Sequence, residues 1–209
     1  NVRVITCDGR YDSARDSDMV GIETWFNERY IKDISRKIRA SLKYKIEKGE
    51  YIGNAPYGYV KSDEYKNRLC VDNDTAYVVR EIYKMYREGY GYKCIAWFLN
   101  SRGYPPPSLR CYAASGISQY NKEQERGAVT VKWSTAAVRR ILTNRVYIGD
   151  TVQGISEKVS FKSKKTRSLP ENRWIVTVGT HEPIIDKEEF EAVRKIREAK
   201  KTFSGAHKK

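Results

Sequence analysis

Lysine and arginine side chains dominate two segments of this sequence, and both segments could bind phosphate groups. Residues 29–48 contain eight lysines or arginines against two acidic residues. Between Lys132 and Arg145 there is no acidic residue, and Arg139 and Arg140 are adjacent. A guanidinium forms forked hydrogen bonds with phosphate oxygens or a guanine edge, whereas an ammonium binds phosphate as a point charge. The residue types therefore indicate binding of a polyanion.

The first basic segment has the periodicity of a long helix. Its apolar residues recur at steps of three or four, and they are Ile31, Ile34, Ile38, Leu42 and Ile46. This spacing predicts a helix from about Ile22 to Lys48 that ends at Gly49. The other face carries the run Arg36, Lys37, Arg39 and Lys43. A solvated face is the alternative for any charge run, but such one-sided charge on a helix of ~40 Å favours phosphate contact.

The second basic segment predicts a short helix with a clear start. Ser134 can accept hydrogen bonds from first-turn amides, and Trp133 before it can pack against Val138. At about 100° per residue, such a helix buries one apolar face and exposes a small, cationic one. The buried face holds Val138, Ile141 and Leu142, and the outer face holds Ala136, Arg140 and Thr143, with Arg139 at its margin. The alternative is again a solvated cationic face.

The other elements complete an α+β fold, with a buried strand at Val2–Cys7 and a turn and hairpin within residues 51–72. Helices are predicted at Thr75–Arg87 with Asp74 as its cap, at Lys93–Ser101, and after a capping box formed by Asp186 and Glu189. Within Lys93–Ser101 we expect Ile95, Trp97, Phe98 and Leu99 to be largely buried. Residues 104–132 show no sustained period, and no fixed structure is predicted for them.

Three short strands are predicted after the second basic segment. Their sequences are "VYIGDTVQG", "EKVSFKS" and "NRWIVTVGTHEPII", and the first two flank a turn at Gly154. A loop between strands is expected to hold Lys162, Lys164, Lys165 and Arg167. These side chains would suit phosphate contacts that do not depend on base sequence, although a cationic loop without a target is an alternative.

Composition limits the classes of partner. The chain has 209 residues, 40% of them hydrophobic, and a formal net charge of +14. So basic a protein is expected to bind nucleic acid or an anionic membrane surface. No apolar run approaches the ~20 residues that span a bilayer, so we expect no membrane-spanning segment and a cytoplasmic location. Nucleic acid rather than a membrane is the expected partner.

The cysteines do not form a metal-binding pattern. Cys7, Cys70, Cys94 and Cys111 are widely spaced without a C-x-x-C pair, and the two histidines lie far from them. Zinc sites usually require close pairs of ligands. We therefore expect reduced thiols, some of them packed as small apolar side chains, and neither a metal nor a cofactor.

Three motifs occur in order along the chain: "YIKDISRKIRASLKYKIEKGEYIGNAPYGY", "IAWFLNSRG" and "WSTAAVRRILTNRVYIGD". Together with the later "THEPIIDKEEFEAV", they strongly resemble the large serine recombinases, the family of phage integrases and mobile-element recombinases. The resemblance covers about Val2 to Lys200. It implies that residues 1–50 hold the end of the catalytic domain and the long connecting helix, and that residues 51–209 form the recombinase DNA-binding domain.

The resemblance also implies partners and a missing activity. Double-stranded DNA is the expected partner, with dimers and synaptic tetramers of a bacterial or phage-encoded, nucleoid-associated full-length protein. The family's nucleophilic serine lies in a Tyr-x-Arg-x-Ser context that is not present here. Ser13, Ser17 and Ser35 are interpreted as loop or helix-surface hydroxyls, so we expect no catalytic residue and no cleavage by this segment. A zinc module and a coiled coil often follow in family members.

Helices 93–101 and 134–143 together suggest a helix-turn-helix core in which the second helix reads DNA, although the loop between them is unusually long. A plain helical core is the alternative. The rival function is a stand-alone DNA-binding transcriptional regulator, which would have no use for the strand Val2–Cys7. The candidate DNA-binding residues are Arg36, Lys37, Arg39, Lys43, Thr135, Ala136, Arg139, Arg140, Thr143, Arg145, Lys162, Lys164 and Lys165.

Overall fold

The computed structural model describes residues 3, 5–7, 12, 17–62, 64–65, 67–109, 131–160 and 162–206. Its helices and three antiparallel strand pairs confirm the predicted α+β class. The chain divides into two compact units. The helix–hairpin unit comprises Asn1–Lys45 and Gly154–Arg173, and the core unit comprises Ile46–Gln153 and Trp174–Lys209. A domain boundary near residue 50 stays a prediction.

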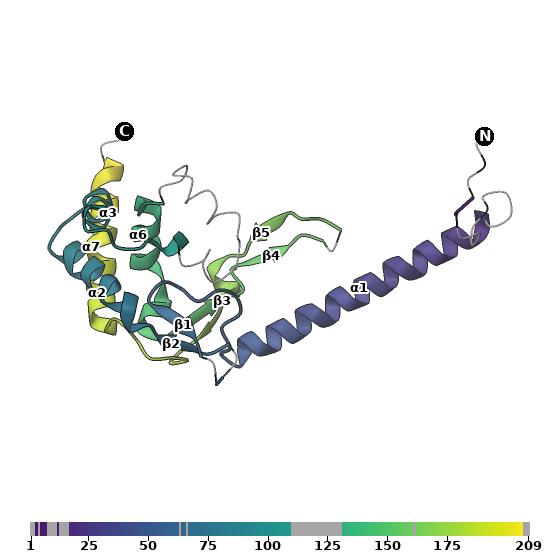
Figure 1. The fold of residues 1–209 in the computed structure, drawn as a ribbon, viewed down its shortest axis with the longest axis horizontal. Coiled ribbons are helices and arrows are strands. Elements are labelled where there is room, and N and C mark those ends of the chain that lie inside the picture. Colours follow the sequence, from purple (N-terminus) through teal and green to yellow (C-terminus); the bar gives the residue numbers. More distant parts are fainter. Residues whose placement is uncertain are drawn as a thin grey trace. The chain divides into compact units, whose positions relative to one another are not determined.

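Helix α1 is one uninterrupted helix over Ser17–Glu47, and it is drawn in purple to blue in Figure 1. It begins five residues before the predicted start and is followed by Gly49 at a φ of +81°. Its apolar face is open in the described chain, because Ile38 is 54% exposed and Ile31 and Leu42 are also exposed. The periodicity therefore predicted the helix correctly, although most of its apolar face is exposed in the described structure.

The start of the chain differs from the predicted strand Val2–Cys7. Ile5 forms a single antiparallel bridge with Asp12, and Arg3 forms an ion pair with Asp12. Val2 and Val4 lie outside the described residues, as do residues 110–130 of the segment that was predicted to lack fixed structure.

Strands β4 (Ser156–Lys158) and β5 (Thr166–Ser168) form the hairpin of the helix–hairpin unit, with the short 3-10 helix η2 (Glu171–Arg173) after them. The two strands that flank Gly154 do not pair with each other. The strand before Gly154, β3 (Thr151–Gln153), pairs instead with β6 (Ile175–Thr177). Pairing partners depend on the whole chain, and the hydrophobic pattern of three-residue strands is too short to specify them.

The core unit packs four helices beside two small strand pairs. They are α2 (Asn73–Arg87), α3 (Tyr92–Ser101), α6 (Thr135–Thr143) and α7 (Lys187–Ala206). Strands β1 (Tyr59–Lys61) and β2 (Leu69–Val71) form a hairpin, and the 3-10 helix η1 (Arg145–Ile148) connects α6 to β3. Figure 1 shows this arrangement, and each of the four helices contributes fully buried side chains to one core.

Two predicted details of α2 and α3 are corrected. The cap of α2 is Asp72 rather than Asp74, because the Asp72 carboxylate accepts hydrogen bonds from the Asp74 amide at 3.2 Å and the Thr75 hydroxyl at 2.6 Å. Trp97 is 69% exposed rather than buried. The reason is helical geometry: Ile95 and Leu99 point into the core, and Trp97 lies about 200° from each around the helix.

The residues that follow α1 are bound to β3. The Gln153 amide nitrogen donates to the Glu50 carbonyl at 2.6 Å, and its oxygen accepts from the Ile52 amide at 2.9 Å. Both ends of this buried amide are therefore satisfied by the backbone. Gln153 fixes the path of the chain as it enters the core unit.

Candidate nucleic-acid interface

Helix α6 is held by the residue before its cap. Asn100 of α3 accepts a hydrogen bond from the Trp133 amide at 2.7 Å and donates to the Trp133 carbonyl at 3.1 Å. The Trp133 indole is buried and donates to the Tyr104 carbonyl at 2.9 Å. The predicted cap is confirmed, since Ser134 accepts a hydrogen bond from the Ala137 amide at 3.1 Å. The beginning of α6 is thus fixed against α3.

The predicted faces of α6 are also confirmed. The buried side chains are Val138, Ile141 and Leu142, and the exposed ones include Thr135, Ala136, Arg139, Arg140 and Thr143. Neither Arg139 nor Arg140 has a side-chain hydrogen bond or ion pair with another residue that the structure describes, whereas the Thr143 hydroxyl donates to the Arg140 carbonyl at 3.2 Å. The two guanidiniums remain available for a ligand.

Arg145 differs from the two arginines of α6. Its guanidinium lies 2.8 Å from the Asp150 carboxylate, whose side chain is only 5% exposed. A buried carboxylate requires such a partner, because an unpaired charge there would be costly. Arg145 therefore neutralises Asp150, and its role as a DNA contact stays a prediction.

The basic residues of α1 lie along the helix surface. Arg36, Lys37, Arg39 and Lys43 are all exposed, and Arg36 approaches Asp33 at 3.7 Å. Residues three or four apart share a helix face, so Arg29 and Lys32 extend the row that contains Arg36, Arg39 and Lys43. A row of this kind can follow successive phosphates of a duplex.

The tip of the β4–β5 hairpin carries the other candidate lysines. Lys162, Lys164 and Lys165 are exposed in the connecting loop, as predicted. The Val159 amide donates to the Lys165 carbonyl at 3.1 Å, which closes the loop, and Lys162 forms an ion pair with Glu28. Arg167 was expected in the loop but lies on β5, where its Nε donates to Glu157 at 2.7 Å.

His181 is buried in the core unit and has a structural environment. Its Nε2 lies 2.7 Å from the Val146 carbonyl and its Nδ1 lies 2.8 Å from the Thr180 hydroxyl. Burial lowers the pKa of His181 from its usual value, because the charged imidazolium is disfavoured away from water. Both nitrogens are engaged, so this side chain is not available to a ligand.

The described part of the chain holds neither a metal-binding cluster nor a disulfide. Within those residues there is no group of three or more His, Cys, Asp or Glu side chains that could hold a metal ion. Cys7, Cys70 and Cys94 are free and exposed rather than packed, and Cys111 lies outside the described residues. No helix among those described is long and apolar enough to cross a bilayer.

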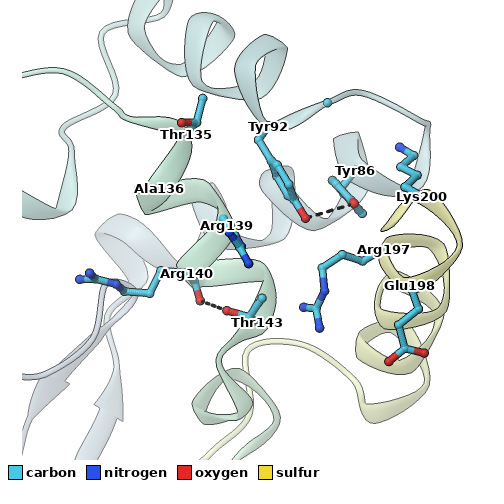
Figure 2. A pocket seen from close by; sticks show the side chains of 11 residues that line it. Tyr86, Tyr92, Thr135, Ala136, Arg139, Arg140, Thr143, Arg197, Glu198 and Lys200 are labelled. Atoms are coloured by element: carbon cyan, nitrogen blue, oxygen red, sulfur yellow. Dashed lines mark hydrogen bonds between the residues drawn. The ribbon is translucent and has the colours of Figure 1, made fainter. Parts of the chain in front are cut away.

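One group of cations was missed by the sequence reasoning. Arg197 and Lys200 of α7 line an open hollow beside α6, together with Tyr92, Arg139, Arg140 and Thr143 (Figure 2). The Arg197 guanidinium donates to the Leu142 carbonyl at 3.2 Å, near the end of α6. The basic composition of the final helix could have indicated these cations. Their contact with α6 could not be predicted, because the two segments lie more than fifty residues apart in the sequence.

The fold and the site define a basic α+β protein with a short, firmly packed helix, on which two exposed arginines have no side-chain partner among the described residues. The chain belongs to the Recombinase family, whose model matches residues 73–200. This match confirms the family that the sequence motifs indicated.

The individual proteins that resemble this chain match it over only part of its length and of theirs. Uncharacterized protein YefB of Bacillus subtilis (strain 168) is 32% identical over 81 residues, which is 39% of this chain and 27% of YefB. A structure from work on the sequence requirements of the Listeria innocua prophage attP site aligns with a TM-score of 0.47 and 22% identity, over 78% of this chain and 51% of that one. The crystal structure of an LSR–DNA complex aligns with a TM-score of 0.48 and 20% identity, over 78% and 38%. The chain spans about half or less of these relatives' length.

Proposed function

We propose that this chain is the DNA-binding part of a large serine recombinase, which it positions on an attachment or transposon-end site for strand exchange. The observation that carries the proposal is the outer face of α6. There Arg139 and Arg140 are exposed and have no side-chain partner among the described residues, while Val138, Ile141 and Leu142 fix the helix in the core. Membership of the Recombinase family supports the recombination part of the proposal.

In this proposal α6 is the recognition helix of a helix-turn-helix and α3 is its support. The two hydrogen bonds between Asn100 and Trp133 hold the start of α6 against α3, as a supporting helix should. Thr135 and Ala136 are small and exposed on the first turn, which leaves room for close approach of a major groove. Arg140, opposite the buried face, is then the residue best placed for a base edge.

Sequence-independent affinity comes from the other basic surfaces. The row on α1 that includes Arg36, Arg39 and Lys43, and the hairpin lysines Lys162, Lys164 and Lys165, supply phosphate contacts. Lys37 lies beside this row. In the intact protein, dimers would bind a bacterial or phage site and tetramers would form in synapsis.

The experiment is selection of bound duplexes from a random-sequence pool. The wild-type chain should enrich a defined sequence, because recognition by α6 favours particular base pairs. Arg140→Ala should bind the enriched duplex more weakly by on the order of 1 to 3 kcal/mol and random duplex with little change. Lys84→Ala is the matched control, since it removes one exposed positive charge from α2 at a residue that does not line the hollow beside α6. Failure of the wild-type chain to enrich any sequence would reject the proposal.

A further inference from the structure

Two guanidinium groups from different helices point into one hollow. Figure 2 shows Arg139 of α6 and Arg197 of α7 directed toward the space between these helices, whereas Arg140 points away to the other side of α6. The hollow is open and has a volume of about 940 Å³. It is large enough for a stretch of sugar–phosphate backbone.

The charge of this hollow is unbalanced. Lys200 adds a third cation, with its ammonium 4.8 Å from the centroid of the Tyr86 ring and 3.2 Å from the Gly89 carbonyl. The acidic residue that lines the hollow, Glu198, accepts a hydrogen bond at 3.1 Å from Arg194, which lies outside it. Among the described lining residues, these three cations face one carboxylate, and a bound anion would relieve their mutual repulsion.

The helices that carry the two arginines are packed against each other. Arg197 donates to the Leu142 carbonyl at 3.2 Å, which uses one of the five N–H groups of its guanidinium. The helices that carry the two arginines are joined through the core, since Leu142 of α6 and Val193 of α7 are fully buried. Two forked donors on helices joined in this way suit the oxygens of a phosphate.

We propose that the hollow binds a backbone phosphate of the DNA strand beside the groove that α6 enters, with Arg139 and Arg197 as the phosphate ligands. This proposal rests on the proposed function and gives the two adjacent arginines of α6 different roles. Arg139 binds phosphate together with α7, and Arg140 faces the base edges. The final helix of the described chain is thereby part of the DNA-binding surface.

The test measures binding of the full chain to a random-sequence duplex at several salt concentrations. Each phosphate contact contributes about −0.9 to the slope of log affinity against log salt. Arg139→Gln and Arg197→Gln should each weaken binding several-fold and make the slope shallower by about that amount. Lys195→Gln removes the same charge from an exposed position of α7 that does not line the hollow, and it should leave the slope unchanged.

Arg197→Gln also removes the bond to Leu142, so the variants are compared for thermal unfolding. Arg139→Gln lacks that complication, and because both arginines share one ligand, the double variant should lose less than the sum of the two single losses. The inference is overturned if both variants keep the wild-type slope. It is also overturned if Arg197→Gln leaves duplex binding intact but abolishes binding of an oligoglutamate peptide, since the hollow would then serve an acidic protein segment.

The two proposals fail in distinguishable ways. Absence of duplex binding or of sequence enrichment by the wild-type chain rejects the proposed function itself. If enrichment occurs and depends on Arg140, but Arg139→Gln and Arg197→Gln behave as Lys195→Gln does, only the phosphate site is rejected.

Discussion

The side-chain amide of Asn100 on α3 binds both backbone polar groups of Trp133, at 2.7 Å to the amide and 3.1 Å to the carbonyl. A side-chain amide that pairs in this way forms the same two hydrogen bonds that the peptide groups of a neighbouring strand would form. It fixes the chain one residue before the cap of α6, and therefore fixes the helix that carries Arg139 and Arg140.

Substitution of Asn100 should destabilise the protein and loosen α6. Asn100→Ala removes both hydrogen bonds and leaves partly buried backbone groups unpaired, so we expect a loss of about 1 to 3 kcal/mol in the free energy of unfolding. Urea denaturation measures it. Ser101→Ala is the control, because it removes one exposed hydroxyl bond to Phe98 from the same helix end and should change stability little. Equal stabilities of the two variants would show that the Asn100 pairing contributes nothing.

Gly149 is expected to be far less tolerant of substitution than Gly89. Both have a positive φ, +86° and +102° respectively, so alanine adds backbone strain at either position. At Gly149 the added Cβ would also lie 2.8 Å from the His181 carbonyl oxygen, whereas at Gly89 nothing lies within 4 Å. Gly149→Ala should therefore lower the melting temperature clearly more than Gly89→Ala. Similar shifts would mean that the backbone at Gly149 and the His181 carbonyl can move apart at little cost in stability.

Stability should depend on pH through His181. Its pKa is lowered in the folded state by burial. The unfolded chain therefore binds a proton more readily, and stability rises with pH wherever the unfolded state holds more protons. The stabilisation is present above pH ~6.5 and declines as pH falls from there toward the folded pKa. Denaturation at pH 7.5 and 5.5 should show a smaller difference for His181→Gln than for the wild-type chain, and an unchanged difference would exclude this histidine as the cause.

The arginines of α1 should affect affinity without affecting sequence preference. Arg39 is exposed on the basic row of α1, and its loss should weaken the selected and the random duplex alike and reduce the salt slope by about one contact. Arg39→Ala is measured by titration of both duplexes at several salt concentrations. Lys93→Ala removes an exposed charge from α3 and controls for the change in net charge. If Arg39→Ala weakened binding to the selected duplex but not to the random duplex, a base contact would be assigned to α1 instead.

Local features were determined by the sequence alone. The cap at Ser134 and the spacing of Val138, Ile141 and Leu142 predicted α6 to within a residue, because capping and amphipathic periodicity involve neighbours within two turns. The long periodic run likewise predicted α1 and its end before Gly49. The ordered motifs also identified the family.

Contacts between distant segments were decided only by the tertiary structure. The pairing of β3 with β6, the ion pair of Arg145 with Asp150 and the approach of Arg197 to the end of α6 were not predicted. The first and third join segments that lie far apart in the sequence. In the Arg145–Asp150 pair the partners are close in sequence, but it is burial of the carboxylate by the fold that requires the arginine. Short strands and single charges are each compatible with many partners, and only the packing of the whole core selects one.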